Sequence, residues 1–146
     1  MKKILIFMGR YLPGYKDGGP IRTISNLVEA LGDEYKFYIV CLDRDHGDEK
    51  PYCNICYDKW NLVGKANVLY IKPKNFSFKL IKNISIDKDI IYLCGFFDDY
   101  GYKTLILNRL HKLHKVPVIV ASMGCFSKGA LKNKQFKKKI FIGICK

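Results

Sequence analysis

The chain has 146 residues, of which 49% are hydrophobic and 27% charged. This length suits one domain, and the composition excludes a disordered tail, a collagen-like fibre and a disulfide-dense miniprotein. The charge is uneven: residues 1–100 carry 15 Lys and Arg against 13 Asp and Glu, whereas residues 101–146 carry 11 bases and no acid. A segment of one sign attracts phosphates, nucleic acid or an anionic membrane, and the charge alone does not choose among them.

No segment has the length and composition of a membrane span. The longest uncharged run, residues 116–127, contains a proline and is shorter than the roughly 20 apolar residues that cross a bilayer. The first residues resemble the opening of a signal peptide, but they lead into Gly9 and Arg10 without a small-residue cleavage site. We therefore expect a cytoplasmic protein whose six cysteines are reduced thiols rather than a disulfide framework.

The predicted elements alternate between strands and helices along the chain. A buried strand is predicted over residues 3–9, a glycine-rich loop over 10–19, and a helix over 20–31 with Gly32 as its stop. A strand over 35–42, a long polar loop over 43–65, a strand over 67–71 and a short helix over 76–84 follow. The last predicted elements are a strand over 89–94, a helix over 102–115, a strand over 116–121 and a lysine-rich helix over 134–144.

This alternation is typical of an α/β protein with a Rossmann-like, mostly parallel sheet flanked by helices, and we assign residues 1–146 to one such domain. Ligands of these sheets bind outside the carboxyl ends of the strands, where the strand order reverses. Three predicted loops begin at such strand ends, over residues 9–19, 94–99 and 122–129. We expect them to form one crevice.

The loop before the first helix offers a site for a phosphate or a sugar. Gly18 and Gly19 let the backbone approach a ligand, the helix start at Pro20 supplies free N–H groups, and Arg22 adds a guanidinium. A tight turn before an ordinary capped helix is the alternative. The sequence has neither the glycine pattern of dinucleotide-binding folds nor a P-loop, so we interpret Asp43, which ends the second strand, as an ordinary loop residue.

Two other loops contain residue types that carry chemistry. Cys53 and Cys56 have the spacing of metal ligands, but the only obvious further donors, His111 and His114, lie some 55 residues on in a predicted helix with its own packing pattern. We therefore interpret the two cysteines as loop thiols and expect no metal site. Asp98 and Asp99 follow the strand over 89–94, where they would bind a hydroxyl, act as a base or simply cap the next helix. We favour capping, and no catalytic residue is assigned.

The loop after the last predicted strand combines glycines, hydroxyls and Lys128 on the expected ligand side. A plain strand-to-helix connection is the alternative. Further on, the run Lys137, Lys138 and Lys139 is typical of a solvated helix face. Because apolar residues follow it directly, the same run is also suited to an anionic membrane surface.

Several of these stretches share a pattern with one enzyme family. They are residues 3–20, residues 43–45 with Trp60 and Asn61, residues 90–97, and residues 121–131 with the lysines beyond them. Together they resemble the N-terminal domain of a retaining glycosyltransferase of the glycosyl transferase group 1 family, whose two Rossmann-like domains face a cleft in the GT-B arrangement. The most specific piece, residues 121–131, resembles an A-P-R-G-x-x-S-x-G-A-L segment followed by a lysine-rich helix.

The resemblance covers nearly the whole chain but only about the first half of such an enzyme. It implies that a sugar is transferred, with retention, from a nucleotide-sugar donor to a glycan or lipid-linked acceptor in cell-envelope polysaccharide synthesis, without a cofactor. It also implies that a C-terminal donor-binding domain is absent, so that this chain is incomplete alone. The residues implied in donor or acceptor binding are Gly18, Gly19, Arg22, Gly95, Phe96, Met123, Gly124 and Lys128.

Two expectations concern partners. Peripheral contact with the inner face of an anionic membrane is expected through Lys137, Lys138 and Lys139, whereas nucleic acid is not expected as a partner. The alternative function is a basic, non-catalytic module that binds an anionic membrane surface or nucleic acid.

Overall fold

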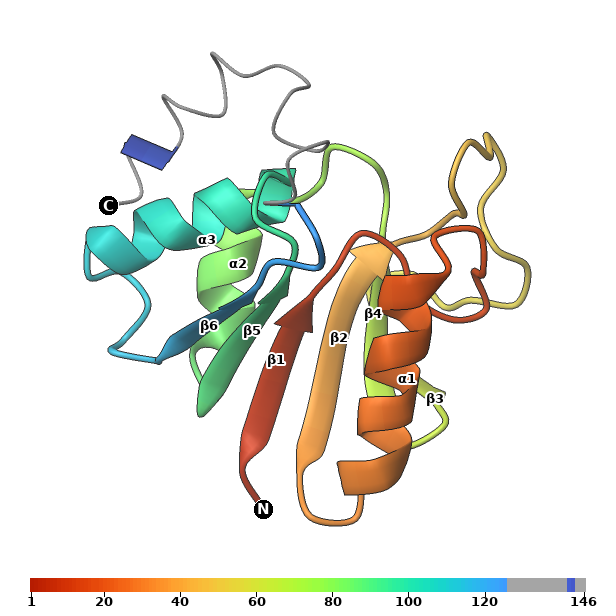
Figure 1. Cartoon of the computed structure of the whole chain (residues 1–146), viewed down its shortest axis with the longest axis horizontal. Coiled ribbons are helices and arrows are strands. Elements are labelled where there is room, and N and C mark those ends of the chain that lie inside the picture. Colours follow the sequence, from red (N-terminus) through yellow and green to blue (C-terminus); the bar gives the residue numbers. More distant parts are fainter. Residues whose placement is uncertain (126–141, 144–146) are drawn as a thin grey trace.

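The computed structural model describes residues 1–125 and 142–143. Its strands are β1 (Lys3–Phe7), β2 (Lys36–Leu42), β3 (Asn61–Val63), β4 (Ala66–Ile71), β5 (Ile90–Cys94) and β6 (Val118–Ala121). Its helices are α1 (Gly19–Leu31), α2 (Phe78–Ser85) and α3 (Asp99–Arg109). Figure 1 shows one twisted sheet with helices packed against it.

The six strands form a single sheet in the order β3–β4–β2–β1–β5–β6. All neighbours pair in parallel except β3, which runs antiparallel to β4 at one edge. The five parallel strands alone therefore have the order of a Rossmann-like sheet, in which the chain moves first to one side of β1 and then to the other. The predicted α/β class and mostly parallel sheet are confirmed, and each predicted strand matches an observed one to within two residues at either end.

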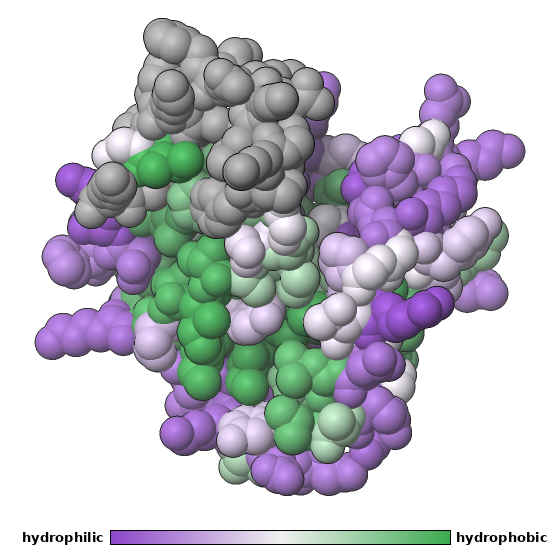
Figure 2. Space-filling view, in the orientation of Figure 1, coloured by the Kyte–Doolittle hydropathy of each residue, from purple (hydrophilic) through white to green (hydrophobic). Residues whose placement is uncertain are grey.

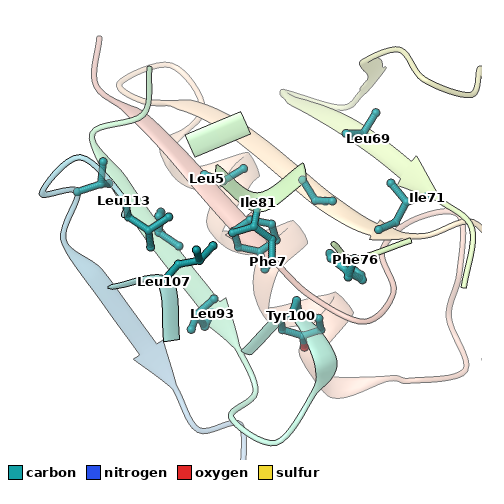
Figure 3. Packing of buried hydrophobic residues seen from close by; sticks show 13 residues of the cluster. Leu5, Phe7, Leu69, Ile71, Phe76, Ile81, Leu93, Tyr100, Leu107 and Leu113 are labelled. Atoms are coloured by element: carbon teal, nitrogen blue, oxygen red, sulfur yellow. The ribbon is translucent and has the colours of Figure 1, made fainter. Parts of the chain in front are cut away.

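Helices cover both faces of the sheet because successive strand residues point to opposite sides. Ile6 and Met8 pack with Ile24 and Val28 of α1 in one buried cluster. Leu5 and Phe7 point the other way, into a cluster with residues of α2 and α3, as Figure 3 shows around Ile81, Leu107 and Tyr100. The continuous apolar runs of the strands thus reflect burial on both faces.

One part of the sheet has no described helix over it. Figure 2 shows hydrophobic residues gathered beside α1, over the strands at the β6 side of the sheet. Ile119 of β6 is 48% exposed there, and Tyr92 of β5, which is its neighbour in the strand pairing, is only partly buried. Within residues 1–125, the helix cover on the α1 face is therefore incomplete.

Two sequence predictions need correction. The region 43–65 is not a loop throughout, because Asn61–Val63 pairs with β4. The Asn61 side chain fixes this short strand by bonding to backbone groups of Cys56, Lys59 and Val68.

The second correction concerns the helix predicted over 102–115, which begins earlier and ends at Arg109. His111, His114 and Lys115 have positive φ, so the helix cannot continue through them. Leu113 reaches the buried cluster through the loop, whereas Leu110, predicted on the same helical face, is 59% exposed. The helix predicted over 134–144, with Lys137, Lys138 and Lys139, lies outside the described residues apart from Ile142 and Gly143.

Candidate functional site

A crevice of about 290 Å³ lies at the carboxyl ends of β1 and β5, the neighbouring strands at which the strand order reverses. All three predicted loops contribute to it, the third through its described residues 122–125. The residues that line the crevice are Met8, Gly9, Arg10, Asp17, Pro20, Cys94, Gly95, Asp98, Tyr100, Ser122, Met123 and Cys125. The expectation that these loops meet is therefore confirmed.

The first wall of the crevice contains an ion pair. Arg10 follows β1 and donates through Nη1 to Asp17 Oδ2 at 3.0 Å, and both side chains are about a quarter exposed. The other oxygen of Asp17 lies 3.0 Å from His46 Nδ1. The Nε of Arg10 is buried and, within the described residues, has no hydrogen-bond partner. Arg10 thus keeps a donor beyond those that hold Asp17.

The opposite wall contains Asp98, Tyr100 and the end of β5. The hydroxyl of Tyr100 lies 3.1 Å from Asp98 Oδ2 and also bonds to the carbonyl oxygen of Cys94. Desolvation raises the pKa of the Asp98 carboxyl, and it outweighs the opposing effects of the Tyr100 hydroxyl and of Arg10. Asp98 occupies the N-cap position of α3, as predicted, and Asp99 lies in the first turn, but the Asp98 side chain makes no capping hydrogen bond.

The residue that follows β5 in the wall of the crevice, Gly95, has to be a glycine. Gly95 has a φ of 106°, a conformation that side chains rarely adopt. A Cβ on Gly95 would collide with the Asp98 carboxylate and lie 3.2 Å from the Tyr100 hydroxyl. The position therefore needs glycine both for its backbone and for the room beside Asp98.

The thiol of Cys94 also lines the crevice, but it is not poised to react. Burial raises its pKa to about 12, so the thiol stays protonated at neutral pH. This chemistry argues against a nucleophilic role for Cys94.

Asp43 is committed to structure rather than to a ligand. Its side chain is fully buried at the end of β2 and is held by Arg44 at 2.8 Å from Nε and 3.3 Å from Nη2. The hydroxyl of Tyr57 donates to the same carboxylate at 3.1 Å. The interpretation of Asp43 as a loop residue without a ligand role is consistent with these bonds, because a ribose would have to displace them.

A neighbouring buried carboxylate holds the glycine-rich loop in place. Asp45 accepts hydrogen bonds from the backbone N–H groups of Tyr15 at 2.9 Å, Lys16 at 3.2 Å and His46 at 2.8 Å. Burial alone would raise the pKa of Asp45, but these N–H groups outweigh it and lower the pKa. Asp45 thereby connects the loop after β2 to the loop that carries Asp17.

The glycine loop itself opens to solvent. Gly18 has a φ of 57° and precedes α1, which has no side-chain cap. A Cβ on Gly18 or Gly19 would meet nothing within 4 Å, so ligand atoms have room to approach this backbone. Both glycines lie between Asp17 and Pro20, which line the crevice, whereas Arg22 is exposed on the first turn of α1 and does not line it.

The remaining predicted residues fall in three groups. Gly95 and Met123 line the crevice. Phe96 and Gly124 adjoin lining residues in sequence without lining it themselves, and Lys128 lies outside the described residues. Arg10 and Asp17 line the crevice but were not singled out from the sequence, whereas Ser122 was counted only among the hydroxyls of its loop. Position is the one signal for Arg10, which directly follows a predicted strand, and Asp17 had none.

Metal and redox chemistry find little support in the geometry. In the described part of the chain, no group of three or more His, Cys, Asp or Glu could hold a metal ion. Cys53 and Cys56 are exposed thiols, and all five described cysteines are free. No helix among the described residues is long and apolar enough to cross a membrane.

No protein-family model, curated protein or solved structure matches this chain.

Proposed function

We propose that this chain is the acceptor-side domain of a retaining glycosyltransferase and that the crevice binds a sugar unit of the acceptor. Two independent lines support the proposal. The sequence resembles the N-terminal domain of that family, and the Rossmann-like sheet has a polar crevice at its strand-order reversal.

The observation that carries the proposal is the mixture of polar groups around the crevice. Arg10 supplies N–H donors, Asp17 and Asp98 supply carboxylate acceptors, and Ser122 supplies a hydroxyl. Sugar hydroxyls both donate and accept, so they suit a wall of this mixed kind. The volume of about 290 Å³ lies just below the roughly 300–1,000 Å³ typical of small-molecule sites. That size favours a sugar ring over a whole nucleotide.

Each residue has a role in this proposal. Asp98 accepts a hydrogen bond from the acceptor hydroxyl and orients it, while Arg10 and Asp17 hold neighbouring hydroxyls. The open backbone at Gly18 and Gly19 borders the donor diphosphate, most of whose contacts come from a second domain. The acceptor hydroxyl attacks the anomeric carbon, and the departing diphosphate takes its proton. The protein contributes orientation and stabilisation of the leaving group.

The geometry gives less support to a dinucleotide-dependent enzyme. In such folds an acidic residue near the end of the second strand binds the ribose of the cofactor. Asp43 stands in that position here, but its carboxylate is fully buried and bonded to Arg44 and Tyr57.

A glycan array probed with the labelled full chain tests the proposal. We expect binding to a restricted set of oligosaccharides that is lost in Arg10→Gln and weakened in Asp98→Asn. Lys36→Gln, an exposed position on β2, is the control and should bind like the native chain. Binding to no glycan, or binding that neither crevice substitution changes, would contradict the proposal.

A further inference from the structure

The connection between α3 and β6 is a second surface that the crevice does not explain. It runs over residues 110–117 and enters β6 at Val118, which pairs with Ile91 near the start of β5. This connection therefore lies at the amino-terminal edge of the parallel strands, whereas the crevice lies at their carboxyl ends. It forms the left margin of the molecule in Figure 1.

Two buried side chains fix this connection to the domain. Leu113 and Val116 are 1% and 7% exposed and belong to the cluster that holds α2 and α3. Backbone N–H groups of His111 and Lys112 bond to carbonyl oxygens of α3. The residues between these anchors are consequently held in fixed positions facing outward.

Most of the residues that face outward are Lys or His. His111, Lys112, His114 and Lys115 are all exposed. Residues 100–125 contain no acid, and within the described residues Lys112 and Lys115 form no ion pair. Hydrophilic residues project on the left of Figure 2 below the grey part, the side on which Figure 1 places this connection.

The acids at the start of β5 do not neutralise this charge. Asp87 pairs with Lys3 at 2.9 Å and also with Lys88. Asp89 accepts a hydrogen bond from the backbone N–H of Lys3 at 2.7 Å. Both carboxylates are thus engaged with Lys3 and Lys88 rather than with Lys112 or Lys115.

The backbone and one apolar side chain add to the pattern. His111, His114 and Lys115 have φ values of 53°, 50° and 62°, a conformation unfavourable for such residues. Leu110 stands at the end of α3, next to these residues in the chain, with 59% of its surface exposed. The fold therefore maintains three unfavourable backbone conformations in a segment that presents basic side chains and a leucine together.

We propose that the exposed residues Leu110, His111, Lys112, His114 and Lys115, hereafter the α3–β6 patch, dock on the surface of an anionic phospholipid bilayer. Lysines near such a surface are attracted by the headgroup charge, and an exposed leucine gains by entering the acyl boundary. A bilayer attached here leaves the crevice, at the opposite edge of the sheet, open to the aqueous phase. The inference does not depend on the proposed function.

A lipid surface fits the α3–β6 patch better than nucleic acid does. Single-stranded nucleic acid is bound by combining cations with aromatic side chains that stack on bases, and residues 110–116 contain no Phe, Tyr or Trp. Leu110 has no comparable partner on a phosphate backbone. A substitution of Leu110 therefore distinguishes lipid binding from nucleic-acid binding.

Cosedimentation with vesicles at about 0.15 M salt tests this proposal. The full chain is mixed with vesicles of phosphatidylglycerol and phosphatidylcholine, and with vesicles of phosphatidylcholine alone. We expect binding to the anionic vesicles only. Lys112→Gln/Lys115→Gln should weaken it by roughly fivefold per charge, about 25-fold in all. The control Lys50→Gln/Lys59→Gln removes the same charge from exposed positions in the loop between β2 and β3.

The outcomes separate the partners. Leu110→Ser should weaken vesicle binding severalfold while leaving the weaker retention on heparin or duplex DNA unchanged. Thermal unfolding of each variant checks that the fold is intact. Absence of native-chain binding to anionic vesicles would overturn the proposal, as would equal losses in the patch variant and its control. Retention on DNA that exceeds vesicle binding and ignores Leu110→Ser would assign the patch to nucleic acid instead.

Discussion

Arg10 and Asp17, seven residues apart in the glycine-rich loop, form an ion pair of 3.0 Å in the wall of the crevice. The pair is partly exposed, so it contributes little to folding, on the order of 1 kcal/mol or less. Its structural effect is to place a guanidinium and a carboxylate side by side where a ligand enters. Arg10→Gln should therefore affect binding far more than stability.

In glycan binding, we expect Arg10→Gln to raise the dissociation constant about 10- to 100-fold, the loss typical of a hydrogen bond to a charged group. Titration calorimetry with the best glycan from the array measures it, and urea unfolding measures the accompanying change in stability. A variant that unfolds at much lower urea but binds normally would show that the pair is structural.

Gly95 should not tolerate a side chain. Gly95→Ala places a Cβ against Asp98 at a φ of 106°, so we expect a loss of about 1–3 kcal/mol in the free energy of unfolding. Gly19→Ala is the matched control, because its Cβ meets open space and its φ is not positive. Its stability should change by less than about 0.5 kcal/mol. Equal stability of the two variants would contradict the close approach of Asp98.

The Asp45 carboxylate should hold the glycine-rich loop in its conformation. Asp45→Ala leaves the N–H groups of Tyr15, Lys16 and His46 without their acceptor, and we expect a loss of about 2–3 kcal/mol in the free energy of unfolding. Hydrogen exchange should accelerate at Tyr15 and Lys16 before it does in the strands.

Asp48→Ala is the control for Asp45→Ala. This substitution removes an exposed carboxylate that forms an ion pair with Lys16 of the glycine-rich loop. The free energy of unfolding should fall by less than about 1 kcal/mol. Unchanged exchange at Tyr15 and Lys16 in Asp45→Ala would show that the loop is held by other contacts.

Asp87 should make the free energy of unfolding depend on pH in the acidic range. Hydrogen bonds from Lys88 and Lys3 lower its pKa to about 2, below the ordinary value near 3.9. Its contribution is therefore complete above about pH 4 and is lost as the pH falls through about 2. Because the Asp87 side chain is 57% exposed, solvent screening limits this contribution to about 1 kcal/mol.

Denaturant unfolding of the native chain and Asp87→Asn across pH tests this. The difference in unfolding free energy should be constant from pH 7 to 5 and shrink as the pH falls below 4. A difference that grows toward low pH would have the opposite sign from the one expected for a lowered carboxyl pKa.

The parallel strands were predictable because burial on both faces makes them continuous apolar runs that end at turn residues. β3 was not, because Asn61–Val63 is held by the Asn61 side chain and by pairing with β4 rather than by a pattern of its own. The end of α3 was misplaced because Leu113 falls at helical spacing yet reaches the core through left-handed residues.

The location of the crevice followed from the order of strands and loops, but its chemistry did not. Arg10, Asp17 and Asp98 become neighbours through contacts across the fold, including the bonds from Asp45 to the loop that carries Asp17. Contacts between residues far apart in the chain produce no periodic pattern in a single sequence, so they could not be predicted from it. For Cys53 and Cys56 the sequence offered a signal without a site. Their spacing is that of metal ligands, but among the described residues no further His, Cys, Asp or Glu joins them in a group that could hold a metal ion.

We propose above all that the crevice at the ends of β1 and β5 binds an acceptor sugar. Amide chemical-shift mapping of the labelled full chain, titrated with the best array glycan and separately with uridine diphosphate, tests it most directly. We expect the glycan to shift the amides of Gly9, Gly95 and Ser122, and the diphosphate to shift those of Gly18 and Gly19. Glycan-induced shifts confined to surfaces away from the crevice would contradict it.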